Sequence, residues 1–133
     1  MQIASALFVE DFNIRQVDGP STRLDLTGVL FSLVAPSAPP VTIEPHLVAL
    51  IHCRPDEDGT GVFEVVVTRS PDPEAETEQI ARNVSPFQVE PGRFTYRLVR
   101  AEIAFEEPST AYAHCRIDRG PWTTVPLTLL PAG

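Results

Sequence analysis

Hydrophobic and polar residues alternate along most of this chain, in short segments separated by turn-forming residues. A period of two is typical of β-strands with one buried face, and no segment has the 3.6-residue spacing of an amphipathic helix. The segments that we predict to be strands are residues 3–14, 23–34, 44–54, 62–69, 93–105, 111–118 and 125–129. Residues 77–83 fit either one helical turn or a short edge strand.

Two of these segments contain a change of phase. In residues 23–34 the apolar face moves from Leu26 to Val29, and Gly28 stands at the slip, which predicts a β-bulge there. A second change near Leu98 and Val99 indicates another bulge, or burial on both faces of that strand.

The connections are predicted from their turn residues. Residues 17–21 and 56–61 have the composition of turns, and we expect residues 44–69 to form a β-hairpin around the second of them. The proline-rich residues 35–40 are incompatible with a central strand. Residues 70–78, rich in proline and carboxylates, are expected to form a solvated loop.

The strand pattern predicts an all-β fold. About seven or eight strands at this spacing indicate two packed antiparallel sheets, a β-sandwich of immunoglobulin-like type. The chain has 133 residues, so we expect residues 1–133 to form a single domain with a proper hydrophobic core.

Charge excludes several functions. The formal net charge is −8, which has the wrong sign for binding nucleic acid or an anionic membrane. All ten cationic side chains are arginines, so Schiff-base catalysis by lysine and the lysine-containing phosphate loop are absent. Arginine in place of lysine, with abundant alanine, proline and valine, is typical of a GC-rich bacterial genome.

The ends and the cysteines predict a cytoplasmic protein. The first residues lack the positive segment of a secretory signal, and no stretch approaches the roughly 20 apolar residues of a membrane span. In that compartment Cys53 and Cys115 are expected to be reduced thiols.

The tripeptide His-Cys-Arg occurs twice, beginning at His52 and at His114. Two such pairs on adjacent strands would suggest a zinc or thiol site. Because adjacent strand residues point to opposite faces, each histidine and its cysteine do not converge easily on one metal. We therefore expect Cys53 and Cys115 in the core and both histidines outside it. Whether the two pairs lie close in space is left open by the sequence.

Acidic turns offer the other candidate chemistry. Asp56 and Asp58, with Asp118 after the second tripeptide, are candidate calcium ligands, although their spacing differs from that of the calcium-binding loop. Motifs for a nucleophilic serine or a zinc protease are missing, so we assign no catalytic residue and no cofactor. Trp122 is expected to be either a core anchor at a corner or an exposed contact.

Three parts of the chain resemble a family of small bacterial β-sandwich proteins of unknown function. Residues 4–11 resemble the opening strand of that family, and residues 23–30 resemble its second strand, with Gly28 in the glycine position. Phe105, Tyr112 and residues 117–120, closing at residues 126–127, resemble its C-terminal hairpin. Residues 106–110 depart from the family, which has a glycine-centred turn there. The resemblance implies a β-sandwich and assigns no activity.

These observations favour a non-catalytic module that binds another protein or a second copy of itself, because the edge strands of a small sandwich offer unpaired backbone groups. The alternative is a metal- or ligand-binding domain that uses the loop around Asp56 and Asp58. An enzyme is the third choice, and it would need a pocket joining His52 or His114 to a carboxylate and a hydroxyl.

Overall fold

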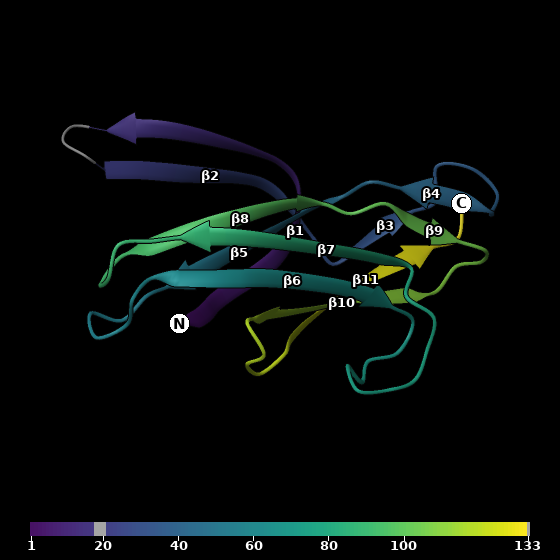
Figure 1. Cartoon of the computed structure of the whole chain (residues 1–133). Coiled ribbons are helices and arrows are strands. Elements are labelled where there is room, and N and C mark those ends of the chain that lie inside the picture. Colours follow the sequence, from purple (N-terminus) through teal and green to yellow (C-terminus); the bar gives the residue numbers. More distant parts are fainter. Residues whose placement is uncertain (18–20, 133) are drawn as a thin grey trace.

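The chain is an all-β protein (Figure 1). The computed structural model describes residues 1–17 and 21–132, and these contain eleven strands in three sheets and no helix. The strands are β1 (Gln2–Val17), β2 (Ser21–Leu30), β3 (Ser32–Val34), β4 (Val41–Ile43), β5 (His46–His52), β6 (Thr60–Thr68), β7 (Ala81–Gln88), β8 (Phe94–Arg100), β9 (Ile103–Phe105), β10 (Thr110–Ile117) and β11 (Thr123–Leu130). The tip of the turn predicted at residues 17–21 lies outside the described residues.

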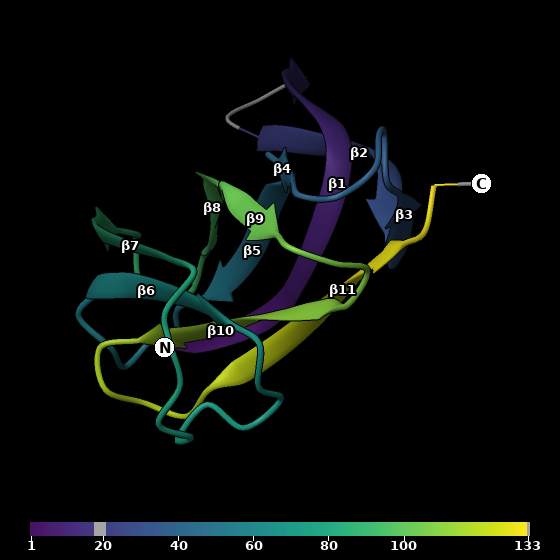
Figure 2. The same cartoon turned by 90° about the vertical axis from the view of Figure 1, so that its right-hand side faces the viewer.

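The two larger sheets contain nine of the strands. The four-stranded sheet has the order β2-β1-β5-β8, and the five-stranded sheet has the order β3-β11-β10-β6-β7. The third sheet pairs β4 with β9, and Figure 2 looks onto the end of the molecule at which it lies. No described helix is long and apolar enough to cross a membrane.

The all-β class is confirmed, whereas the predicted number of seven or eight strands is too low. The segment 23–34 is divided at Phe31, where the chain leaves the four-stranded sheet and joins the five-stranded one. The segment 93–105 is divided at residues 101–102, where the chain leaves the four-stranded sheet and joins the two-stranded sheet as β9. Antiparallel pairing throughout is also wrong, because β3 runs parallel to β11.

The hairpin predicted for residues 44–69 is wrong. β5 belongs to the four-stranded sheet and β6 to the five-stranded sheet, so the turn between them connects two sheets instead of two paired strands. Cys53 is fully buried, as predicted, and Leu47 and Ile51 are buried with it. Residues 77–83 turn out to lead into an edge strand, because β7 begins at Ala81 and pairs with β6 alone.

Neither predicted bulge is present. The register of β2 against β1 is the same on both sides of Gly28, and Leu30, not Val29, packs against the core. The register of β8 against β5 is likewise unbroken through Leu98 and Val99. Val99 is buried and Leu98 is half-buried, which agrees with the alternative of burial on both faces.

One hydrophobic core joins all three sheets. Its largest contributors are Phe8, Leu47, Ile51, Phe63, Val65, Val67, Ile103, Phe105, Leu127 and Leu129. Because β4 and β9 contribute Val41, Ile43, Ile103 and Phe105 to this cluster, the small sheet closes one end of the core.

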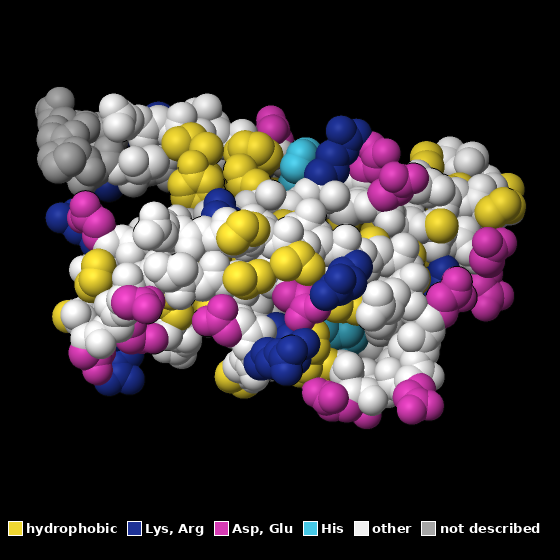
Figure 3. All heavy atoms as spheres, viewed as in Figure 1, with side chains coloured by type: hydrophobic (Ala, Val, Ile, Leu, Met, Phe, Trp, Pro, Cys, Tyr) yellow, Lys and Arg dark blue, Asp and Glu magenta, His cyan; other side chains and the backbone are white. Residues whose placement is uncertain are grey.

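The β1–β2 hairpin covers part of the outer face of its own sheet. Phe12, on the hairpin, makes an edge-to-face contact with the ring of His46 on β5, with centroids 5.3 Å apart. Val9 and Val48 are fully buried although they lie outside the main core cluster. Hydrophobic side chains gather between this hairpin and β8 in Figure 3.

Candidate functional site

The two His-Cys pairs lie in different sheets. Cys53 follows β5 and Cys115 is on β10, and both are free, fully buried thiols, as predicted. Burial raises the pKa of the Cys115 thiol to about 12, so this sulfur stays protonated and unreactive. His52 is half-buried and packs against Phe94, with ring centroids 4.6 Å apart.

His114 lies on the outer face of the five-stranded sheet, outside the core cluster as predicted, but it is not a surface residue because it is only 1% exposed. Its Nε2 lies 3.0 Å from the carbonyl oxygen of Ser70 and 3.1 Å from Oγ1 of Thr68, and its Nδ1 lies 2.8 Å from Oγ1 of Thr124. Since a carbonyl only accepts, Nε2 is the protonated nitrogen and Nδ1 accepts from Thr124.

The loop at residues 70–78 provides the cover over His114. Desolvation lowers the pKa of the imidazole, and the Ser70 carbonyl and the charge of Asp72 oppose that shift only in part. The imidazole is therefore neutral, and its hydrogen bond to Ser70 connects the loop to the sheet. The predicted solvated loop is largely exposed, but Ser70 is bound to the sheet.

Trp122 is neither a core anchor nor a free surface contact. Its ring lies under the guanidinium of Arg116, 4.0 Å from the centroid, and its Nε1 donates to Oε1 of Glu74 at 2.9 Å. Arg116 in turn donates to Glu64 at 2.6 Å. Burial opposes ionisation of Glu64, but its hydrogen bonds to Arg116 and Arg82 outweigh burial and lower the pKa of this carboxyl. These groups form a saturated polar network on the outer face.

The candidate calcium ligands are each occupied by a contact within the protein. Asp58 Oδ1 accepts from the backbone N–H of Thr60 at 2.9 Å, and Asp118 Oδ1 accepts from that of Val62 at 3.0 Å. Asp56 pairs with Arg54 in an exposed contact. Within the described residues, no three His, Cys, Asp or Glu side chains gather in a group suited to a metal ion.

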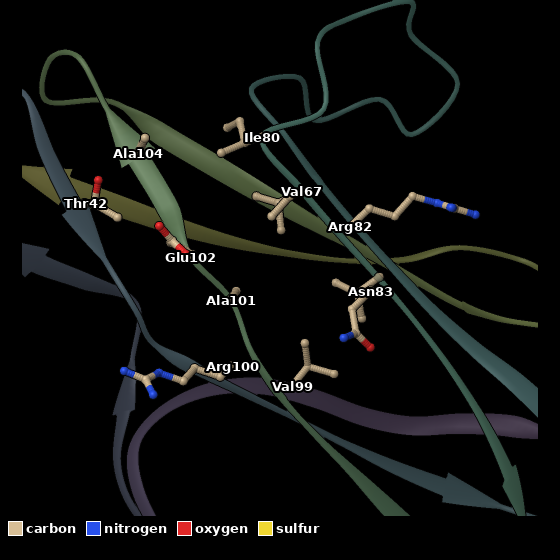
Figure 4. A pocket seen from close by; sticks show the side chains of 12 residues that line it. Thr42, Val67, Ile80, Arg82, Asn83, Val99, Arg100, Ala101, Glu102 and Ala104 are labelled. Carbon is tan, nitrogen blue, oxygen red and sulfur yellow. The ribbon is translucent and has the colours of Figure 1, made fainter.

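A groove of about 390 Å³ lies where two strand edges face each other (Figure 4). One wall is the start of β7, from Ile80 to Asn83. The other runs from Val99 at the end of β8 to Ala104 in β9. Val65 and Val67 of β6 form the floor. In the part of the chain that the structure describes, β7 pairs only with β6 and β8 only with β5, so each strand leaves one edge without a partner.

Two arginines bridge the walls beyond the ends of the groove. Arg97 of β8 donates from Nη2 to the carbonyl oxygen of Pro86 in β7 at 2.6 Å, and its guanidinium lies over the Phe87 ring. At the other end Arg69 donates to the carbonyl oxygen of Ala104 at 2.6 Å and lies over Phe105. Arg97 thus connects the two large sheets, and Arg69, which follows β6, connects the five-stranded sheet to β9 of the small sheet.

Glu102 is the one ionised side chain of the groove lining that has no ion-pair partner among the described residues. Arg82 and Arg100 extend away from the groove in Figure 4, because Arg82 pairs with Glu64 and Arg100 with Glu44. Glu102 and Asn83 stand on opposite walls, and their side chains make no hydrogen bond or ion pair with any described residue. The rim therefore offers a free carboxylate and a free amide above an apolar floor.

The groove was not predicted from the sequence. The alternation of Val65, Val67 and Val99 indicates buried faces, but nothing local shows that β7 and β8 are the open edges of different sheets. Comparison with models of known protein families finds no match for this chain, and a search of curated proteins finds none either.

Proposed function

We propose that this protein is a non-catalytic binding module that holds an extended segment of another protein in the groove between β7 and β8–β9. The observation that supports it most directly is the pair of unpaired strand edges facing each other across an apolar floor. An extended segment satisfies such edges through its backbone and places alternate side chains on the floor.

The dimensions favour a short segment. From Ile80 to Asn83 the β7 wall advances three positions, which at the rise of a strand is roughly 10 Å. The arginine bridges lie beyond the ends of this wall. A segment of about three or four residues fits along it, and small or β-branched side chains match the valine floor and the alanine walls.

The charge favours a basic segment. Glu102 is the only ionised group of the lining without a partner among the described residues, and the whole chain carries a net charge of −8. The overall field attracts a cationic partner, and Glu102 offers it one carboxylate for an ion pair; both act mainly on the rate and specificity of association.

The lining supports binding in preference to catalysis. It contains no histidine, cysteine, serine or lysine, and its one hydroxyl, on Thr42, has no general base in the lining other than Glu102. A nucleophile with an adjacent oriented base is the usual requirement for covalent or hydrolytic chemistry.

The finer descriptions of fold and location are proposals as well. An immunoglobulin-like sandwich of the two larger sheets is supported by the single core that their facing strands share. A bacterial cytoplasmic location is supported by the arginine-only composition and by two free buried thiols.

The test is a selection of random peptides displayed on phage against the folded protein, followed by calorimetric titration of the enriched sequences. We expect short basic sequences with β-branched residues. Glu102→Arg should weaken their binding at least tenfold, whereas Glu107→Arg, an exposed charge change outside the groove lining, should weaken it far less. Selected peptides that bind both variants equally would contradict the proposal.

A further inference from the structure

A second hollow lies on the opposite side of the two large sheets, where β1 and β2 meet β11. Its volume is about 250 Å³, and its apolar lining includes Ala6, Leu7, Val29, Phe31, Val125 and Pro126. Its lining contains no ionisable side chain at all. This is an unusual surface for a chain with a net charge of −8.

Phe31 stands at the border of this hollow and is 77% exposed, the most of any large hydrophobic side chain described. Its backbone is fixed, because β2 ends at Leu30 and β3 begins at Ser32. Its carbonyl oxygen also accepts from the N–H of Thr128 at 3.2 Å. A rigid, exposed aromatic residue loses little conformational freedom on binding, which is the property of an interface anchor.

Phe31 and the hollow together form a surface patch that could pair with a second copy of itself. The exposed aromatic ring and the apolar hollow lie side by side on this patch. In a two-fold symmetric contact the same patch serves both partners, so each Phe31 would enter the hollow of the other copy. Val29, which is 39% exposed beside Phe31, would be covered in the same contact.

The charge distribution is compatible with a second copy as the occupant of the hollow. Two molecules that each carry a net charge of −8 repel each other over most of their surfaces. An uncharged lining is where two copies approach at the lowest electrostatic cost. A basic partner, by contrast, would gain nothing from this surface. We propose that the chain forms a two-fold homodimer in which Phe31 of each copy occupies the β1–β2–β11 hollow of the other.

Sedimentation velocity from micromolar to near-millimolar concentration tests this inference. We expect a reversible dimer, and one that strengthens as salt is raised, because salt screens the repulsion between like-charged copies. Phe31→Ser should raise the dimer dissociation constant about tenfold or more. A monomer at every concentration and salt level would overturn the inference.

Phe94→Ser is the matched control. Phe94 is 65% exposed on another face, so its truncation removes the same side chain without touching the hollow. It should leave the dimer unchanged, and a dimer lost equally in both variants would overturn the assigned interface. Circular dichroism of each variant shows whether it is folded. Peptide binding at the β7–β8 groove is measured separately, and raised salt should weaken that binding. A failure of the dimer proposal can therefore be distinguished from a failure of the peptide-binding proposal.

Discussion

Arg97 and Pro86 join the two large sheets across their open edge. The Nη2 of Arg97 donates to the carbonyl oxygen of Pro86 at 2.6 Å, and the guanidinium carbon lies 5.2 Å from the centroid of the Phe87 ring. The Nε of the same guanidinium is buried and finds no hydrogen-bond partner among the described residues. The bridge that limits the groove thus also contains a destabilising element.

Substitutions of Arg97 should separate its packing on Phe87 from its polar interactions. Arg97→Ala removes the hydrogen bond, the unpartnered Nε and the packing on Phe87, and we expect it to lower the free energy of unfolding by about 1–3 kcal/mol. Arg97→Met removes the same polar groups but keeps an aliphatic chain on Phe87, so its cost should be below about 1 kcal/mol. Urea unfolding measures both values. An equal cost for the two variants would show that the packing on Phe87 contributes nothing to stability.

The burial of His114 predicts a pH dependence of stability. Its pKa is lowered in the folded state, so above the ordinary value of 6.5 the ring is neutral in both states. As the pH falls below that value, the unfolded chain takes up the proton first. The free energy of unfolding therefore decreases until the folded pKa is passed.

Thermal or urea unfolding of His114→Gln between pH about 7 and about 5 checks this prediction. The variant should be less stable at neutral pH by about 2 kcal/mol, since a buried network is disturbed, and it should lose the part of the pH slope due to His114. His52→Gln is the control and should keep that part of the slope. A slope that is unchanged in His114→Gln would contradict the assignment.

Two glycines with similar backbone angles should respond differently to alanine. Gly59 has a φ of 80° and Gly92 a φ of 83°, so both substitutions carry the strain of a left-handed conformation, about 1 kcal/mol. At Gly59 the added Cβ would also lie 1.9 Å from the carbonyl oxygen of Val89, which is backbone, whereas at Gly92 the nearest atom is 3.6 Å away.

We therefore expect Gly59→Ala to lower the free energy of unfolding by at least about 2 kcal/mol more than Gly92→Ala. Chemical denaturation of the two variants side by side provides the comparison. Similar losses in both would mean that the turn before β6 relaxes freely, and the close approach of Gly59 to Val89 would then have no energetic weight.

The sequence was a good guide to faces and a poor guide to partners. Alternation placed Cys53 and Cys115 correctly in the core, because the period of a strand is a local property. It did not show that β5 and β6 belong to different sheets, since a turn between paired strands and a turn between sheets use the same residue types. The burial of His114 was missed for a related reason: Ser70, 44 residues away in sequence, lies against its ring.

Neither the groove nor the hollow could be predicted from the sequence, and the physical reason is the same for both. Each is formed by edges of different sheets, and membership of a sheet depends on contacts between distant segments. The sequence signal that did point toward them was the length of the apolar segments at residues 23–34 and 93–105. Each proved to contain two strands with a change of sheet between them.

The central claim is that the β7–β8 groove holds an extended segment of another protein. The most direct test is a titration with a selected basic peptide in which the backbone amide chemical shifts of the protein are mapped. We predict that the large shifts are confined to residues 80–83 and 99–104, with intermolecular contacts between the peptide backbone and one strand edge. Shifts spread over the acidic residues 56–58 and 74–78, and abolished by moderate salt, would show nonspecific attraction and contradict the claim.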